Sequence, residues 1–242
     1  MSDPILSLNG LHTDIAQYHI LQGVDLVVPR GQVTMLLGRN GVGKTTTLKS
    51  IMGQWAAKSG EIHYDGQDIT RLSVSARARA GIGFVPEDMG IFRDLTVEEN
   101  MVLGCTSGPL DPKRKDWLLS AFPALGTFWR SEAGNLSGGQ KQMLSIARAM
   151  AEDRKLYLID EPTKGLAPAI VSTMARALRE LKAQGASILL VEQNFSVARA
   201  LGDSAAVMDD GRVIWNGAMS ELAENKDLQE RLMGLSMEGA LR

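Results

Sequence analysis

The chain has 242 residues, of which 44% are hydrophobic and 22% charged, which is ordinary for a globular protein. Its formal net charge of −2 gives no electrostatic basis for binding DNA or RNA. Cys105 is the only cysteine, which excludes an intrachain disulfide and a cysteine-based zinc site.

The N-terminal segment lacks a basic region followed by an apolar core, so we expect no secretory signal. No apolar run reaches the roughly 18 residues needed to cross a bilayer, so we expect a cytoplasmic protein that meets membranes only through partners. Residues 5–29 alternate loosely between apolar and polar and carry turn residues at Asn9-Gly10 and Gly23. This pattern predicts short antiparallel strands.

Residues 33–52 are the most informative stretch, because an apolar run gives way to a glycine-rich loop and then to helical spacing. The loop fits G-x-x-x-x-G-K-[ST] in the strand–loop–helix context that this phosphate-binding pattern requires, which disfavours an ordinary glycine-rich turn. Backbone N–H groups and the positive helix end would face a polyphosphate, Lys44 would reach the β- and γ-phosphates, and Thr45 would ligate Mg²⁺. The expected nucleotide-binding residues are Gly38, Arg39, Asn40, Gly41, Val42, Gly43, Lys44, Thr45 and Thr46.

Strands and helices alternate through the rest of the chain. Such alternation around a phosphate-binding loop predicts a mostly parallel sheet with right-handed crossovers, whose ligands bind beyond the carboxyl ends of the strands. The tail, residues 220–242, is expected to be mostly helical. Strands are predicted at 61–64, 82–85, 156–159 and 187–191, helices at 73–80, about 141–150, 171–181 and 195–201, and a hairpin at 207–215.

Residues from Met89 onwards break this alternation. Thr96 opens a helix with a capping box, and three prolines, at 109, 112 and 123, allow only short helices after it. The basic run at 113–115 is interpreted as a charged loop. We interpret the 242 residues as one α/β domain, in which about 89–151 form an inserted helical subdomain and residues 1–88 and 152–242 form the core with an antiparallel β subdomain.

An acidic pair follows the predicted strand at 156–159. Asp160 would hold Mg²⁺ directly or through water, and Glu161 would polarise a water for in-line attack on the γ-phosphorus. Alone, such a pair could equally be an exposed strand terminus. Downstream of a phosphate-binding loop, the functional interpretation is favoured.

Residues 136–140, Leu-Ser-Gly-Gly-Gln, resemble the signature segment of ABC-type ATPases. Taken with the phosphate-binding loop, this resemblance covers essentially the whole chain and implies the ABC nucleotide-binding-domain type of P-loop NTPase fold. It also implies a head-to-tail pair of cassettes with ATP sandwiched between the phosphate-binding loop of one and the signature of the other. The residues that would contact ATP from the second cassette are Ser137, Gly138, Gly139 and Gln140. By the same resemblance Tyr18, 26 residues before Lys44, would stack on adenine; otherwise it is a strand residue packing on the core.

Three positions depart from the usual ABC pattern. The glutamine expected after the strand at 82–85 is Glu87, which could ligate Mg²⁺ but adds negative charge beside the phosphates. The histidine expected after the strand at 187–191 is Gln193, which could donate a neutral hydrogen bond to the γ-phosphate. Ala167 replaces a usual aspartate.

This combination resembles one of the two ATPase subunits of bacterial importers for branched-chain amino acids, urea and amides. The resemblance implies a second, non-identical ATPase subunit, two membrane permease subunits, an indirectly acting periplasmic binding protein, and a location on the inner face of the cell membrane. Two alternatives remain open. One is a nucleotide-binding structural subunit with low turnover, suggested by Gln193 and Ala167; the other is a soluble ABC ATPase that acts on DNA or the ribosome.

Overall fold

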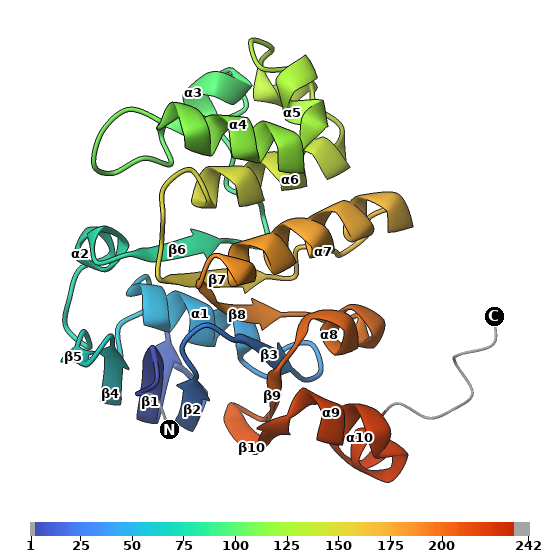
Figure 1. The fold of residues 1–242 in the computed structure, drawn as a ribbon. Coiled ribbons are helices and arrows are strands. Elements are labelled where there is room, and N and C mark those ends of the chain that lie inside the picture. The colour runs from blue at the N-terminus through green and yellow to red at the C-terminus, as the bar shows by residue number, and fades with distance from the viewer. Residues whose placement is uncertain (1–2, 235–242) are drawn as a thin grey trace.

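The computed structural model describes residues 3–234, which form two sheets and the helices packed on them (Figure 1). The larger sheet is parallel apart from one edge strand, β10, which pairs antiparallel with β9 through the predicted turn at Asp210-Gly211. Both turn residues have positive φ, as such hairpin turns require. The strand order is β10 (Arg212–Ala218), β9 (Ser204–Asp209), β3 (Val33–Leu37), β8 (Ser187–Val191), β7 (Leu156–Asp160), β6 (Ile82–Val85).

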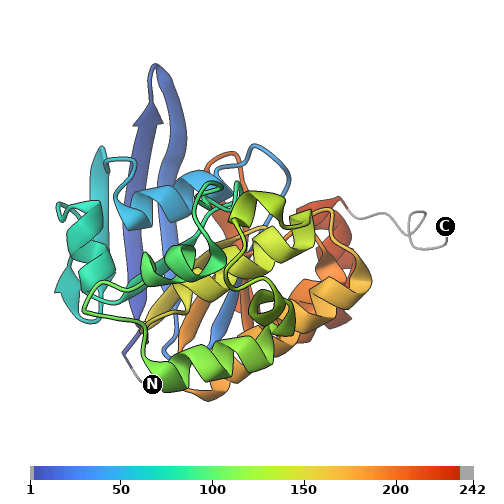
Figure 2. The same ribbon diagram turned by 90° about the horizontal axis from the view of Figure 1, so that it is seen from above.

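The smaller sheet is antiparallel, as predicted for the N-terminal segment, in the order β2 (Tyr18–Val28), β1 (Leu6–Ile15), β4 (Ser59–Tyr64), β5 (Gln67–Asp68). The prediction of short strands was wrong, because β1 and β2 have 10 and 11 residues. Register shifts interrupt their pairing, which explains why the apolar alternation in the sequence is loose. Figure 2 shows this pair as a blue hairpin that extends beyond the other elements.

The central strands β3, β7 and β8 are buried throughout, because both faces of the parallel sheet are covered. Met35 and Leu37 of β3 lie in a core shared with the later helices, whereas Leu36 lies in a second core beneath the antiparallel sheet. Leu48 and Ile51 of α1 (Lys44–Met52) complete this second core. The phosphate-binding loop, which joins β3 to α1, is therefore held between two buried elements.

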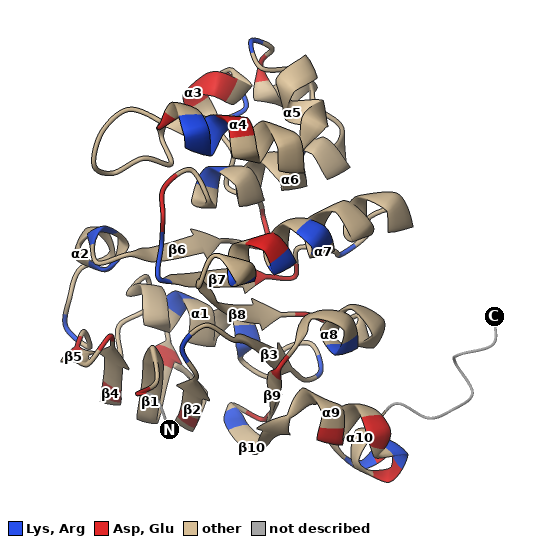
Figure 3. Ribbon diagram, viewed as in Figure 1, with Lys and Arg blue, Asp and Glu red and all other residues tan. Residues whose placement is uncertain are grey.

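The helices outside the region between β6 and β7 are amphipathic or short. Lys and Arg occur together with Asp and Glu along α7 and α10 (Figure 3). The helical tail is confirmed up to Met233, and the predicted remainder, residues 235–242, lies outside the described residues. None of the described helices is long and apolar enough to span a bilayer. These helices are α2 (Val74–Arg79), α7 (Pro168–Ala183), α8 (Phe195–Leu201), α9 (Met219–Glu224) and α10 (Lys226–Met233).

The segment between β6 and β7 is helical and gathers at the top of Figure 1. Prolines occupy the first turns of α4 and α5, where the missing N–H costs nothing, and Thr96 forms the predicted capping box of α3. The basic run at 113–115 is helical, not the loop we predicted, because Asp111 caps α4. The elements are α3 (Val97–Val102), α4 (Pro112–Ala121), α5 (Pro123–Thr127), a 3-10 turn (Ala133–Asn135) and α6 (Gly138–Ala149).

Candidate nucleotide-binding site

Four neighbouring parallel strands, β3, β8, β7 and β6, end at the same edge of the large sheet. Each end carries a residue singled out from the sequence: Gly38 directly follows β3, Gln193 lies two residues after β8, Asp160 ends β7, and Glu87 lies two residues after β6. The sheet topology therefore brings residues from distant parts of the chain to one site.

The phosphate-binding loop depends on glycine at both ends. Gly38 has φ 139°, and a Cβ there would lie 2.3 Å from the Met208 carbonyl oxygen. Gly43 has φ 105°, and its Cβ would lie 2.9 Å from Leu21 Cδ2. Gly43 is also the N-cap of α1, and no side chain among the described residues caps that helix start. The N–H groups of the first turn consequently remain available to an anion.

Lys44 is only 5% exposed, and its Nζ donates hydrogen bonds of 2.8 Å to the carbonyl oxygens of Gly38 and Arg39. Burial lowers the pKa of Lys44, while the carboxylates of Glu161 and Asp160 oppose that shift. The Lys44 ammonium is thus held inside the loop by two backbone carbonyl oxygens. It lines a pocket of about 420 Å³ together with Ile20, Asn40, Gly41, Gly43, Thr45, Thr46, Glu87, Glu161 and Lys164.

Asp160 is fully buried, and neither of its carboxylate oxygens has a hydrogen-bond partner among the described residues. Burial raises the pKa of Asp160 to about 6, and the nearby Thr45 hydroxyl, which does not meet the geometry of a hydrogen bond here, opposes that rise. An orphaned buried carboxylate fits a cation ligand, and Thr45 on the same site offers a hydroxyl oxygen, a donor type that Mg²⁺ accepts. The described residues contain no cluster of three His, Cys, Asp or Glu side chains able to hold a metal.

Glu161 is 9% exposed and has φ 45°, an uncommon backbone conformation for a residue other than glycine. Its N–H donates to the Val191 carbonyl oxygen at 3.0 Å, which ties the turn after β7 to the end of β8. Gln193 Nε2 donates a hydrogen bond of 2.6 Å to Glu161 Oε2. The structure therefore brings these two predicted residues together and fixes the direction of the carboxylate.

Glu87 lies at the pocket rim, where its Oε1 accepts a hydrogen bond of 2.7 Å from Lys164 Nζ. The same Nζ is 3.4 Å from Glu161 Oε2. The hydrogen bond to Glu87 raises the pKa of Lys164. Sequence reasoning missed Lys164, although a cation three residues after Glu161 in a glycine-containing turn was a signal that could have found it.

The signature segment, residues 136–140, leads into α6, which begins at Gly138, before the predicted start at about 141. Ser137 is the N-cap, and its N–H donates a hydrogen bond of 2.8 Å to Gln140 Oε1, which completes a capping box. Gly138 is exposed with open space around it, whereas Gly139 is buried and its Cβ would lie 2.2 Å from Ile170 Cδ1. None of these residues lines the pocket around Lys44 in the described part of the chain.

Tyr18 begins β2 at the tip of the projecting hairpin, where it is 63% exposed. Ile20, not Tyr18, lines the pocket around Lys44. The register shifts between Thr13–Leu21 and Asp14–His19, so Ile20 is an extra residue in β2 and the alternation of faces is broken between it and Tyr18. Tyr18 is therefore exposed to solvent, and Ile20 contributes an apolar side chain to the pocket that the sequence did not indicate.

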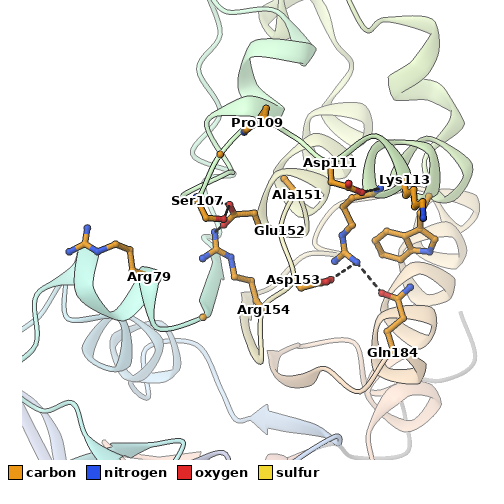
Figure 4. Close-up of a pocket in the computed structure, with 14 residues that line it drawn as sticks. Arg79, Ser107, Pro109, Asp111, Lys113, Ala151, Glu152, Asp153, Arg154 and Gln184 are labelled. Atoms are coloured by element: carbon orange, nitrogen blue, oxygen red, sulfur yellow. Dashed lines mark hydrogen bonds and ion pairs between the residues drawn. The ribbon is translucent and has the colours of Figure 1, made fainter.

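A larger pocket, about 760 Å³, lies elsewhere, between α4 and the turn before β7 (Figure 4). Two ion pairs line it: Arg154 with Glu152 at 2.8 Å, and Arg114 with Asp153 at 2.8 Å. Glu152 also accepts hydrogen bonds from the loop at Thr106 and Ser107. The pair of Arg114 with Asp153 ties α4 to the turn before β7, whereas the phosphate-binding loop and the Asp160 carboxylate, unpartnered within residues 3–234, lie at the strand ends.

A glycine-rich loop at a helix start, beside carboxylates at the ends of parallel strands, defines the class of P-loop nucleoside triphosphatases. The family model described as "ABC transporter" matches residues 21–164. A solved structure of a nucleotide-free ATP-binding cassette from an ABC transporter superposes with a TM-score of 0.82, at 25% identity, and covers 96% of this chain and 100% of its own.

Curated relatives agree over nearly the whole length. The chain is 35% identical to the high-affinity branched-chain amino acid transport ATP-binding protein BraG of Pseudomonas aeruginosa, covering 95% of this chain and all of BraG. It is 36% identical to the probable branched-chain amino acid transport ATP-binding protein LivF of Archaeoglobus fulgidus, covering 93% and 97%. It is 31% identical to the lipopolysaccharide export ATP-binding protein LptB of Escherichia coli, covering 89% and 91%. The chain belongs to the ABC transporter family and is one of its ATP-binding, ATP-hydrolysing cassettes.

Proposed function

We propose that this cassette powers an importer for branched-chain amino acids or related small polar solutes such as urea and short amides. The observation that carries the proposal is the 35–36% identity to BraG and LivF over more than nine tenths of each chain. The combination of Glu87, Ala167 and Gln193, which resembles that branch of ABC ATPases, supports the same assignment. The chain is also similar to LptB, so export of lipopolysaccharide is a second candidate function. It ranks below import because the identity to LptB is lower, at 31%.

The site residues divide the chemistry among them. The N–H groups of the loop and the Lys44 ammonium would bind the β- and γ-phosphates, replacing the carbonyl contacts that Lys44 now makes. Thr45 and Asp160, with Glu87 at the rim, would hold Mg²⁺, which supplies charge neutralisation at the phosphates when bound. Glu161 would accept a proton from the attacking water, and Gln193 orients its carboxylate.

ATP would be bound between two cassettes. The capped start of α6, with exposed Ser137 and Gly138, offers a second set of N–H groups away from the pocket around Lys44. A head-to-tail arrangement would present this helix start to the nucleotide of the partner. We propose that the partner is a second, non-identical ATPase, and that both dock on two permease subunits at the inner face of the membrane, served by a periplasmic binding protein.

Uptake measurements test the assignment. In the source organism, deletion of the gene should reduce uptake of radiolabelled leucine, urea or a short amide, and the wild-type gene should restore it. Lys44→Ala should not restore it, because each lost charge-assisted phosphate contact is worth about 1.5–3 kcal/mol. Lys155→Ala, an exposed lysine away from the site, is the control. Unchanged uptake of all three solutes with altered outer-membrane lipid would favour the export candidate.

Affinity purification from membranes tests the partners. The tagged chain should recover a second ATPase and two membrane proteins in a stable complex. Recovery of two identical cassettes would replace the heterodimer by a homodimer. Recovery of nucleic acid or ribosomes without membrane proteins would favour the soluble ABC ATPase instead.

A further inference from the structure

The pocket around Lys44 must accept a polyanion, yet its own charges are finely balanced. Lys44 and Lys164 line it as cations, Glu87 and Glu161 line it as anions, and buried Asp160 lies beside them. Every carboxylate left without a counter-ion would repel the phosphates of ATP, since like charges in a partly buried site interact more strongly than in water. The position of each cation therefore decides which carboxylates the site tolerates.

Glu87 is the carboxylate whose presence needs explanation, because the usual ABC pattern has a neutral glutamine at this position. It comes from the segment after β6, and Lys164 comes from the turn after the neighbouring strand, β7. Their 2.7 Å hydrogen bond joins these two segments across the pocket rim. A neutral glutamine at position 87 would need no such partner.

The turn that carries Lys164 is itself well defined. The N–H of Lys164 donates to the Glu161 carbonyl oxygen at 3.3 Å, and the N–H of Leu166 donates to the Thr163 carbonyl oxygen at 3.2 Å. Gly165 has φ 70°, which permits the tight reversal. The Thr163 hydroxyl donates a buried hydrogen bond of 2.8 Å to Glu192 Oε1. Lys164 is therefore presented to Glu87 from a turn anchored on both sides.

We propose that Lys164 is a positioning residue of the ATP site, whose ammonium neutralises and holds Glu87 so that a carboxylate can stand beside the triphosphate. The inference rests on the proposed ATP site. Lys164 binds Glu87 through Oε1, which leaves Oε2 outside this hydrogen bond. Lys164 Nζ also lies 3.4 Å from Glu161 Oε2, so its positive charge partly neutralises Glu161, the residue proposed as the general base.

The pair is exposed enough to make its effect modest and dependent on salt. The side chains of Lys164 and Glu87 are 58% and 45% exposed, so their attraction adds little to folding stability. Loss of one positive charge next to bound phosphates is felt chiefly in nucleotide affinity at low ionic strength, where screening is weak. An effect of Lys164 on ATP affinity at low salt, without an effect on folding stability, would therefore distinguish charge compensation from a structural role.

The test is equilibrium binding of ATP to the purified full chain in the presence of a chelator, so that no metal ligation by Glu87 enters. At low salt, Lys164→Gln should weaken binding about three- to tenfold, and Glu87→Gln should strengthen it about twofold or more. The ATP affinity of the double variant Glu87→Gln/Lys164→Gln should return to within about twofold of the wild-type value. Lys164→Arg, which keeps the charge, should bind ATP as tightly as the wild type. Raising the salt concentration should shrink the loss in Lys164→Gln.

Lys155→Gln is the matched control, because Lys155 is 60% exposed and forms a 2.6 Å ion pair with Asp65 outside the pocket. Its ATP affinity should equal that of the wild type. Equal weakening in Lys164→Gln and in the double variant would overturn the proposal, because the lysine would then act without Glu87. Wild-type affinity in Lys164→Gln would also overturn it. If the wild type binds no ATP at all, the ATP site itself is refuted, and the inference with it.

Discussion

The side-chain amide of Gln193 lies 2.6 Å from Glu161 Oε2, to which it donates a hydrogen bond across the ends of two adjacent strands. A neutral donor orients the carboxylate without competing for its proton, because an amide does not titrate near neutral pH. Glu161 sits in a left-handed backbone conformation and is mostly buried, so its direction is set from both the main chain and the side chain.

Glu161→Gln should reduce the rate of ATP hydrolysis by about 10²–10⁴ while leaving ATP bound, because a general base is lost and the loop that holds the phosphates is unchanged. Steady-state hydrolysis in the assembled complex and equilibrium ATP binding measure the two effects separately. Equal, slow turnover in wild type and variant would instead support the structural subunit with low turnover.

Gln193→His should introduce a dependence of the hydrolysis rate on pH near neutrality. A histidine beside Glu161 would gain an anionic partner, which raises its pKa above the usual value of about 6.5. Below that pKa the imidazolium would neutralise Glu161 and weaken it as a base, so activity should rise as the pH is raised. Rate profiles of wild type and variant from pH 6 to 9 would check this, with Gln193→Asn as the non-titrating control; superimposable profiles would contradict the role of Gln193.

Asp160→Asn should stabilise the chain in the absence of nucleotide. The pKa of Asp160 is raised from 3.8 to about 6 by burial, so the folded state holds its proton more tightly than the unfolded state. Ionising Asp160 in the folded state therefore lowers the free energy of unfolding. This loss is absent below pH 3.8, grows between pH 3.8 and about 6, and reaches about 3 kcal/mol above pH 6. Denaturant unfolding of wild type and variant at pH 5 and pH 7.5 should show the variant's advantage increasing with pH; a constant difference would contradict the raised pKa.

The sequence predicted the parallel core and its strand ends because buried strands appear as continuous apolar runs, as in 156–159 and 188–191. It predicted the strands β1 and β2 less well, because register shifts in their pairing break the alternation on which the prediction depends. It also missed the helical state of 113–115, where capping by Asp111 outweighed the clustered charge.

The candidate site divides in the same way. Residues in a local pattern could be named as candidates from the sequence: Lys44 from the spacing of the phosphate-binding loop, and Ser137 from the resemblance of its segment to the ABC signature. The pairing of Glu87 with Lys164 and of Gln193 with Glu161 could not, because each joins segments that only the strand order brings together. Sequence motifs do not contain these contacts, because the paired residues are far apart in the chain and meet only in the folded structure.

Gly38→Ala and Gly41→Ala form a matched pair in the phosphate-binding loop. Both glycines have positive φ, so alanine should cost about 1–2 kcal/mol of unfolding free energy at either position. At Gly41 a Cβ meets nothing within 4 Å, whereas at Gly38 it would lie 2.3 Å from a backbone oxygen, adding about 1–3 kcal/mol of overpacking. In denaturant unfolding, Gly38→Ala should therefore have a clearly lower free energy of unfolding than Gly41→Ala. Equal free energies for the two variants would contradict this account of the loop.

Tyr18→Ala should weaken ATP binding about fivefold, equivalent to about 1 kcal/mol, if the ring stacks on adenine as the family resemblance implies. Folding stability should not change, since the side chain is 63% exposed. Inorganic triphosphate lacks a base, so its affinity should be the same for wild type and variant, which separates stacking from any effect on the phosphate-binding loop. Ile20→Ala is the informative comparison, because Ile20 lines the pocket and Tyr18 does not. If Ile20→Ala weakens ATP binding and Tyr18→Ala leaves it unchanged, then the base is covered by the extra residue in β2, and spacing from Lys44 points to the wrong side chain.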